Sequence, residues 1–298
     1  MRKRTILARF GVLLVAVFGV SSKAAAFRVL VTNDDGFDAP GLSVLVEALD
    51  ANPALEVAVI APETNQSGTG DQFTNGPIDI RADVTQAGFP ALAVTGRPAD
   101  TVLFGILKQL PERPDVVVSG INLGQNIAEL VNISGTVGAG LSAARLGVPA
   151  IAVSQALVPG SYDEAAAYAA NLVERLRTRK TFRSRMTSTD GSGRALVLNV
   201  NFPSCGVGIT RGVRVVPLGR ARQVVDYTLT MDDGTIRTYA PSIENVSAFA
   251  IDCTSTLVDP RSDLEALTNG FASVTPLNPD LTVNGRVDRF GFLERIDF

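Results

Sequence analysis

Five short, continuously apolar segments constrain the fold of this chain most strongly. Each has five to seven residues rich in Val, Leu, Ile and Ala, and segments with helical spacing of apolar residues separate most of them. The apolar segments are residues 28–33, 55–61, 115–119, 149–154 and 195–201, and the helical ones are 40–49, 98–110, 136–146 and 162–179. Strands that are apolar on both faces must be covered on both faces, as in parallel sheets flanked by helices. The first half is therefore predicted to be a doubly wound α/β domain.

The pattern changes after Asn201. Residues 213–216, 224–230 and 235–240 are predicted as strands, and an Asp-Gly turn at 231–234 joins the last two into a hairpin. The hairpin carries Thr and Tyr but few other apolar side chains, so we expect another subunit to help to cover it.

The first 26 residues have the features of a signal peptide. Arg2, Lys3 and Arg4 precede an apolar run, Phe10–Val20, and Ala24–Ala26 then supplies the small residues that a signal peptidase requires. The run has 11 residues, fewer than the ~20 that span a bilayer. We expect export, to a periplasmic or extracellular location, with cleavage between Ala26 and Phe27 and no stable membrane anchor afterwards. A retained anchor is the alternative.

Removal of this leader makes the chain more acidic. The leader holds five basic side chains and no acidic one, so residues 27–298 carry 22 basic and 30 acidic side chains, a net charge of −8. General nucleic-acid binding is therefore not expected, because it requires a basic surface. Export would place Cys205 and Cys253 in an oxidising compartment, where a disulfide is permitted. Two buried free thiols are equally compatible with the sequence.

The complete absence of histidine limits the chemistry. It excludes His-dependent serine and cysteine proteases, HExxH zinc sites and imidazole acid–base catalysis. Any metal near the polar clusters described below would have only oxygen ligands, which favours Mg²⁺, Mn²⁺ or Ca²⁺ over Zn²⁺.

Four polar clusters follow predicted strands or open a helix. They are Asn33-Asp34-Asp35-Gly36, Asn65-Gln66-Ser67-Gly68, Ser119-Gly120-Ile121-Asn122 and Ser134-Gly135-Thr136. Ligands of open α/β sheets bind beyond the carboxyl ends of the strands, where these clusters are expected. Asp34 and Asp35 could converge on a cation in the turn at Gly36, with Ser67 and Asn122 as neutral ligands.

The third element of this site is an anion-binding helix start. Ser134 and Thr136 can present hydroxyl and N–H groups there. A dication beside such a helix suggests metal-assisted hydrolysis of a phosphate ester. Each cluster alone also has a purely structural explanation, as a turn or as a helix N-cap.

The same residues resemble the SurE family, the survival-protein 5′/3′-nucleotidases and acid phosphatases. The NDDG, SGIN and SGTV motifs carry the resemblance most specifically. The similar segments are residues 28–41, 61–70, 96–102, 113–126, 133–140, 147–154 and, more weakly, 273–282.

The resemblance implies a Rossmann-like, three-layer, mostly parallel sheet over residues 27–201. Residues 202–298 would then provide an extended hairpin and a segment exchanged between subunits of a homodimer or homotetramer. It also implies one divalent metal ion per subunit, Mg²⁺ or Mn²⁺ with Ca²⁺ as a third candidate, on Asp34, Asp35, Ser67 and Asn122. Residues implied to bind the phosphate or line the pocket are Asn65, Gly68, Asn126, Ser134, Gly135 and Thr136.

The chain departs from the family pattern at several positions. Thr64 and Gln66 stand where many cytoplasmic members have basic residues. The sequence of this loop, NQSGTG, is more similar to that of secreted members. Arg97 replaces a smaller residue and would add positive charge near the substrate. Ile133 stands where many members have Tyr, and only Glu129 remains of an acidic pair, which leaves the nucleotide preference open.

The mechanism expected from these residues is hydrolysis of a nucleoside monophosphate by metal-activated water. One of the two aspartates would accept the proton of the water, since no histidine can. Two other functions remain as alternatives: a Ca²⁺-dependent nucleoside hydrolase and an exported solute-binding protein without catalytic activity.

Overall fold

The computed structural model describes residues 26–157, 161–187, 191–220, 224–244 and 250–280. The predicted leader, except Ala26, and residues 281–298 lie outside these ranges. In the described part of the chain, no helix combines the length and the hydrophobicity that crossing a membrane requires.

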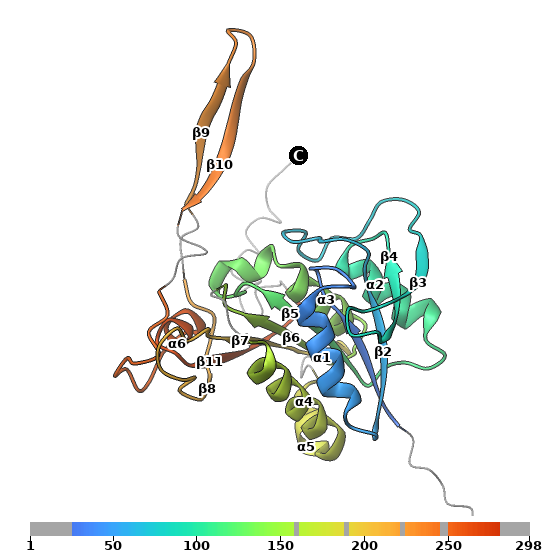
Figure 1. The fold of residues 1–298 in the computed structure, drawn as a ribbon. Helices are drawn as coiled ribbons and strands as arrows, with labels where there is room; N and C mark the ends of the chain where they lie inside the picture. Colours follow the sequence, from blue (N-terminus) through green and yellow to red (C-terminus); the bar gives the residue numbers. More distant parts are fainter. Residues whose placement is uncertain (1–25, 158–160, 188–190, 221–223, 245–249, 281–298) are drawn as a thin grey trace, which may run out of the picture.

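Nine strands form one central sheet (Figure 1). They are β1 (Phe27–Thr32), β2 (Leu55–Pro62), β3 (Ile80–Val84), β4 (Pro90–Val94), β5 (Val116–Leu123), β6 (Ala150–Gln155), β7 (Val197–Phe202), β8 (Val213–Val215) and β11 (Ala272–Leu277). Their order is β3-β4-β2-β1-β5-β6-β7-β11-β8. The six strands from β4 to β7 run parallel, whereas β3 is antiparallel to β4 and β11 is antiparallel to β7.

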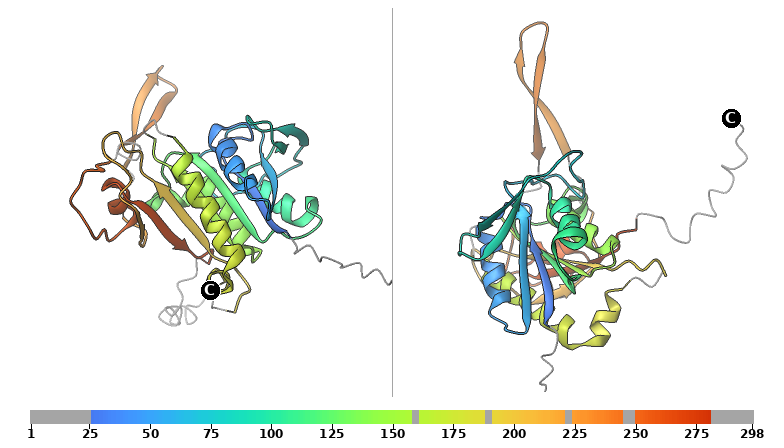
Figure 2. Two further views of the ribbon diagram at one scale, coloured as in Figure 1. Left: turned by 60° about the horizontal axis from the view of Figure 1, so that its bottom comes forward. Right: turned by 90° about the vertical axis from the view of Figure 1, so that its right-hand side faces the viewer.

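Helices cover both faces of this sheet. They are α1 (Pro40–Asp50), α2 (Pro98–Phe104), α3 (Gly135–Arg145), α4 (Asp163–Thr178), α5 (Lys180–Arg185) and α6 (Asp263–Thr268), with a π turn at Gly105–Gln109 and a 3-10 turn at Ala128–Asn132. The helices α1 and α4 pack together on one face, and α2 and α3 on the other (Figure 2). Leu30 and Val31 are adjacent in β1 and both fully buried, one in each of the two cores. The predicted doubly wound α/β fold is confirmed.

The structure also differs from the predicted elements. The strands β3 and β4 were not predicted. β3 is an edge strand whose side chains are mostly exposed and show no apolar pattern, and β4 is a short apolar segment of five residues that begins with Pro90. The predicted helix 98–110 is α2 followed by the π turn. The predicted strand 115–119 continues to Leu123, so Asn122 lies on the strand itself, where it pairs with Ser154 of β6.

The C-terminal part contributes a projecting hairpin and additional strands of the central sheet. The hairpin consists of β9 (Val224–Asp232) and β10 (Arg237–Glu244), and it extends well beyond the main body in all three views (Figures 1 and 2). The predicted hairpin is confirmed and Asp233-Gly234 lies in its turn, but the turn spans residues 233–236 instead of 231–234. Asp233 sets the actual turn, because its carboxylate accepts the backbone N–H groups of Thr235 and Ile236 at 2.9 and 2.7 Å.

A disulfide joins Cys205 to Cys253, so the sequence alternative of two free thiols does not hold in this structure. The Cα atoms are 5.7 Å apart and the sequence separation is 48 residues. The hairpin lies within the chain segment that this bond closes. The disulfide therefore ties together the two connections between the hairpin and the main body.

We expect the disulfide to stabilise the C-terminal part without acting in catalysis. Closing a loop of this length lowers the entropy of the unfolded chain, which stabilises the folded state by about 4 kcal/mol at 25 °C. Replacing both cysteines by serine should lower the free energy of unfolding by that order, measured by urea denaturation. An unchanged denaturation midpoint would contradict this role.

Candidate active site

The four predicted polar clusters lie around the carboxyl ends of neighbouring strands. Asn33 to Gly36 follow β1, residues 63–76 form the loop after β2, and Asn122 lies near the end of β5. Ser134 caps the helix α3 on the same edge of the sheet, since Gly135 packs directly against Asp34. Parallel strand ends place these segments together, as the topology requires.

Asp34 is the most constrained group of the site. Its side chain is 3 % exposed, and its Oδ1 accepts a hydrogen bond of 2.6 Å from the Thr136 hydroxyl. A Cβ atom on Gly135 would lie 2.7 Å from the Cβ of Asp34, so only glycine allows the helix start to approach this closely. Glycine at this position is therefore a packing requirement of the site.

The Asp34 carboxylate is buried, and no positive side chain in the described residues pairs with it. Burial is the main cause that raises its pKa to about 6, and the negative charge of Asp35 raises it further, against the opposing hydrogen bond from Thr136. No ion pair to Asp34 exists in the described residues. A bound cation or proton is what such a carboxylate needs.

Asp35 is held beside Asp34 by two other segments. Its Oδ2 accepts the backbone N–H of Leu123 at 3.1 Å, and its Oδ1 accepts the Asn65 amide at 3.3 Å. Burial raises its pKa too. The Asp35 carboxylate thus connects β5 to the loop after β2.

Backbone hydrogen bonds hold the loop after β2 on either side of its predicted site residues, Ser67 and Gly68. The backbone N–H of Gln66 donates to the Asp34 carbonyl at 2.7 Å, and that of Gly70 donates to the Ile133 carbonyl at 3.0 Å. Between them, Ser67 and Gly68 are exposed, and the side-chain Oδ1 of Asn65 accepts the Ser67 backbone N–H at 2.8 Å. The Ser67 hydroxyl makes no hydrogen bond within the described chain.

Asn122 offers one free oxygen to the site. It is 7 % exposed, and its amide nitrogen donates to the Gly124 carbonyl at 2.6 Å. No donor in the described residues bonds its Oδ1. The residue therefore has the neutral oxygen that its predicted role as a metal ligand requires.

Asn126 joins the site to a buried polar network that the sequence did not reveal. Its amide nitrogen donates to Ser154 at 2.8 Å and to Thr136 at 3.4 Å. Its backbone N–H donates to Asn201 at 2.7 Å, and its carbonyl accepts from Asn199 at 2.7 Å and from Asn201 at 3.1 Å. The sequence feature that could have revealed this network is the pair of asparagines, Asn199 and Asn201, in the otherwise apolar strand β7. Together they fix the segment that supports Thr136.

Asp263 is a second residue that sequence reasoning missed. It is fully buried, and its carboxylate accepts three backbone N–H groups, from Ala128 at 3.0 Å, Gly219 at 2.6 Å and Leu264 at 2.8 Å. Ala128 has a positive φ of 49°, which is uncommon for a residue with a Cβ. Asp263 thus holds the segment between Asn126 and α3 against the C-terminal part of the chain.

Two predicted phosphate-binding residues have other contacts. Thr136 is fully buried, and its hydroxyl contacts Asp34. Arg97 donates to the Gln72 side chain at 2.8 Å and to the Phe73 carbonyl at 3.2 Å, in the far half of the loop. Ser134 is the N-cap of α3 and accepts the Val137 N–H at 3.1 Å, which leaves its own proton available to an anion.

The burial of Asp34 predicts a specific pH dependence of stability when divalent cations are removed. Because its pKa of about 6 in the folded protein exceeds 3.8, stability due to this group is greatest below about pH 4. It is lost as the pH rises through 6, by about 3 kcal/mol in all. In EDTA, Asp34→Asn should therefore gain stability relative to the wild type between pH 4 and 7.5.

Urea denaturation of both proteins across this pH range measures the effect. The exposed Asp79 provides the matched control, since Asp79→Asn makes the same chemical change at the surface, away from the buried carboxylate. A constant difference between the Asp34 variant and the wild type would show that burial does not perturb Asp34.

Comparisons with known proteins agree on one family. The family model described as "Survival protein SurE" matches residues 29–224. A "5'-nucleotidase SurE" of Methylocella silvestris is 37% identical over 270 residues, which cover 88% of this chain and 98% of that protein. The protein of the same name from Symbiobacterium thermophilum is 35% identical over 264 residues, covering 88% and 96%.

A solved structure shows the same architecture. The crystal structure of the SurE protein from Aquifex aeolicus superposes with a TM-score of 0.69 at 28% identity, covering 90% of this chain and 99% of that one. The family model, the relatives that this chain matches over nearly their whole length, and the fold all agree, so this chain belongs to the SurE family.

Proposed function

We propose that this protein is a nucleotidase that hydrolyses the phosphomonoester of nucleoside 5′- or 3′-monophosphates. Two findings support the proposal: the similar proteins named 5'-nucleotidase SurE, and the position of the Asp34 carboxylate. This carboxylate lies against the start of α3, where N–H groups and the Ser134 hydroxyl favour an anion. A site with both an uncompensated carboxylate pair and an anion-binding helix start suits a cation–phosphate pair.

The donor set fits a hard divalent cation such as Mg²⁺ or Mn²⁺. Within the described residues no cluster of three or more His, Cys, Asp or Glu exists. A cation would thus be held by two carboxylates, Asp34 and Asp35, with Asn122 Oδ1 and the Ser67 hydroxyl as neutral donors. When bound, it would supply the positive charge that offsets the carboxylates and polarises a phosphoryl oxygen.

The residues of the chain then have distinct tasks. Thr136 orients Asp34, and Asn126 orients Thr136 through the buried network. Ser134 and the first N–H groups of α3 bind the equatorial phosphoryl oxygens and stabilise the charge that develops on them. Water is the nucleophile, and a carboxylate of the Asp34–Asp35 pair accepts its proton, because the chain has no histidine.

Phosphate release from AMP and p-nitrophenyl phosphate, with Mg²⁺ or Mn²⁺ and in EDTA, tests this function. We expect activity with the cations, none in EDTA, and a loss of about 10²–10³-fold in kcat for Asp34→Asn, the range seen when one preorganised electrostatic group of a site is removed. Asp79→Asn should be fully active. Release of free base would instead identify a nucleoside hydrolase, and tight stoichiometric binding without turnover a solute-binding protein.

Assembly from several copies is a further part of the proposal. The described hairpin exposes five large apolar side chains: Tyr227, Leu229, Met231, Ile236 and Tyr239, at 61, 46, 51, 59 and 48 %. A projecting hairpin with such side chains needs a partner to cover them. We assign this role to a second copy of the chain, in a homodimer or homotetramer.

Export is proposed from the leader sequence. Expression in a bacterial host should yield a protein that begins at Phe27, detected by mass spectrometry of the processed chain. An intact residue 1–26 segment on a membrane-bound protein would favour the retained anchor instead.

A further inference from the structure

Basic side chains concentrate at the end of the molecule where α4 stops and α5 begins. Residues 174–185 carry six basic side chains and one acidic one, whereas the other 260 residues from Phe27 onward carry 16 basic and 29 acidic. Four of the six form an exposed group that we call the basic pole: Arg175, Arg179, Lys180 and Arg185. A strongly positive surface on an otherwise acidic protein calls for an anionic partner.

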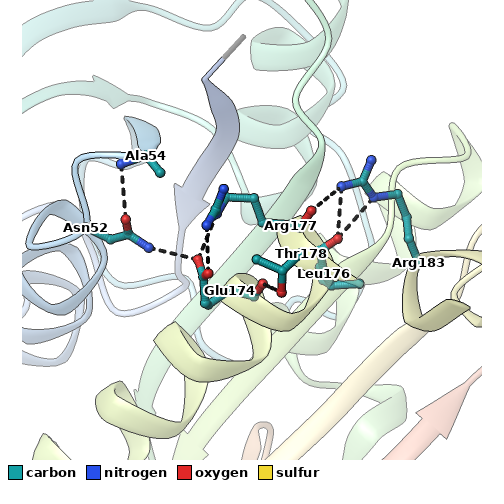
Figure 3. A network of polar contacts seen from close by, with 7 residues as sticks. All are labelled: Asn52, Ala54, Glu174, Leu176, Arg177, Thr178 and Arg183. Carbon is teal, nitrogen blue, oxygen red and sulfur yellow. Dashed lines mark hydrogen bonds and ion pairs between the residues drawn. The ribbon is translucent and has the colours of Figure 1, made fainter. Parts of the chain in front are cut away.

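The other two basic residues hold the segment in place (Figure 3). Arg177 forms a bidentate pair with Glu174, both bonds 2.8 Å long, and thereby uses the only carboxylate of the segment. Arg183 donates to the Leu176 carbonyl at 3.1 and 3.0 Å, and so caps the end of α4. These bonds fix the backbone from which the basic pole projects.

The four side chains of the basic pole have no such partners. In the described residues, no carboxylate lies within ion-pair distance of any of them. Their charges are exposed on rigid helical segments, which lowers the conformational entropy lost on docking.

The start of the exported chain lies at the same end of the molecule. The Arg183 guanidinium stacks over the Phe27 ring at 5.2 Å, and six residues separate Phe27 from the apolar run Phe10–Val20. The leader is therefore attached to the end of the molecule that carries the basic pole.

The active site faces the other way. Tyr162, which precedes α4, lies near the carboxyl end of β5, because both its ring and Ile121 border Gly41. Burial, and then the negative charge of Asp35, raise the pKa of Tyr162. The 16 residues of α4 then span about 24 Å toward the basic pole. Figure 1 shows α5 at the opposite end of the molecule from the hairpin. Docking through the basic pole leaves the strand ends with Asp34 open to substrate.

We propose that the basic pole docks this protein on an anionic phospholipid surface. The proposal rests on the proposed export and is independent of the reaction at Asp34. A membrane fits better than a nucleic acid, because a flat lipid surface meets only the pole, whereas a long polyanion would also meet the acidic remainder. Each basic residue near such a surface contributes about fivefold to the partition coefficient, so four contribute several hundred-fold.

Vesicle co-sedimentation of the exported protein, with its N-terminus verified at Phe27, tests the proposal. The vesicles contain 30% phosphatidylglycerol in phosphatidylcholine, or phosphatidylcholine alone, at low and at 0.5 M salt. The pole variant carries Arg175→Gln, Arg179→Gln, Lys180→Gln and Arg185→Gln. A control of equal net charge carries four exposed changes elsewhere: Lys108→Gln, Arg113→Gln, Arg220→Gln and Arg261→Gln.

The proposal predicts that wild type and control bind only the anionic vesicles, and that 0.5 M salt releases them. The pole variant should lose binding at least 100-fold while its phosphatase activity and denaturation midpoint stay unchanged. Equal binding of pole variant and control, or equal binding to both kinds of vesicle, would overturn it. Tighter pole-dependent binding to single-stranded DNA than to anionic vesicles would also overturn it, in favour of a polyanion site.

Discussion

The burial of one carboxylate, Asp34, without a positive side chain beside it is the constraint on which this site depends. A carboxylate in that position resists ionisation, and burial together with the nearby Asp35 raises its pKa to about 6. The protein keeps it there through one strong hydrogen bond from Thr136 and through the close approach of Gly135. Under the proposed function, a bound cation would offset this cost, and the fold itself would supply the affinity for the cation. A phosphate held by that cation would need no basic cluster, which agrees with the acidic net charge of the chain.

The central sheet holds Asp34 in this position. Leu30 and Val31 fill the two cores on either face of β1, and the strand ends directly before Asn33, Asp34 and Asp35. Asn199 and Asn201 of β7 hold the backbone of Asn126, and the Asn126 side chain donates to the Thr136 hydroxyl. The sheet thereby fixes the position of Thr136. The position of a single oxygen atom therefore depends on strands far apart in the sequence.

The sequence predicted those features that follow from local pattern and from topology. Runs such as 28–33 and 149–154 are apolar on both faces and could only be central parallel strands, and parallel strands bring Asp34, Asn65 and Asn122 to one edge. It did not predict β3, because an exposed edge strand has no pattern to detect. It also missed Asp263 and Asn199, since their partners are backbone groups that only tertiary contact brings near. The role of Thr136 changed for the same reason: a hydroxyl at a helix start suggests an anion, but its actual neighbour is Asp34.

Proton release on cation binding tests the central claim most directly. Calorimetric titration of Mn²⁺ in two buffers of different ionisation enthalpy counts the protons displaced. With a pKa of about 6, Asp34 is about half protonated at pH 6, so binding should release about half a proton or more there and almost none at pH 8. Asp34→Asn should abolish its share of the release and weaken binding strongly. Binding at pH 6 without proton release, or with unchanged affinity in that variant, would contradict the account.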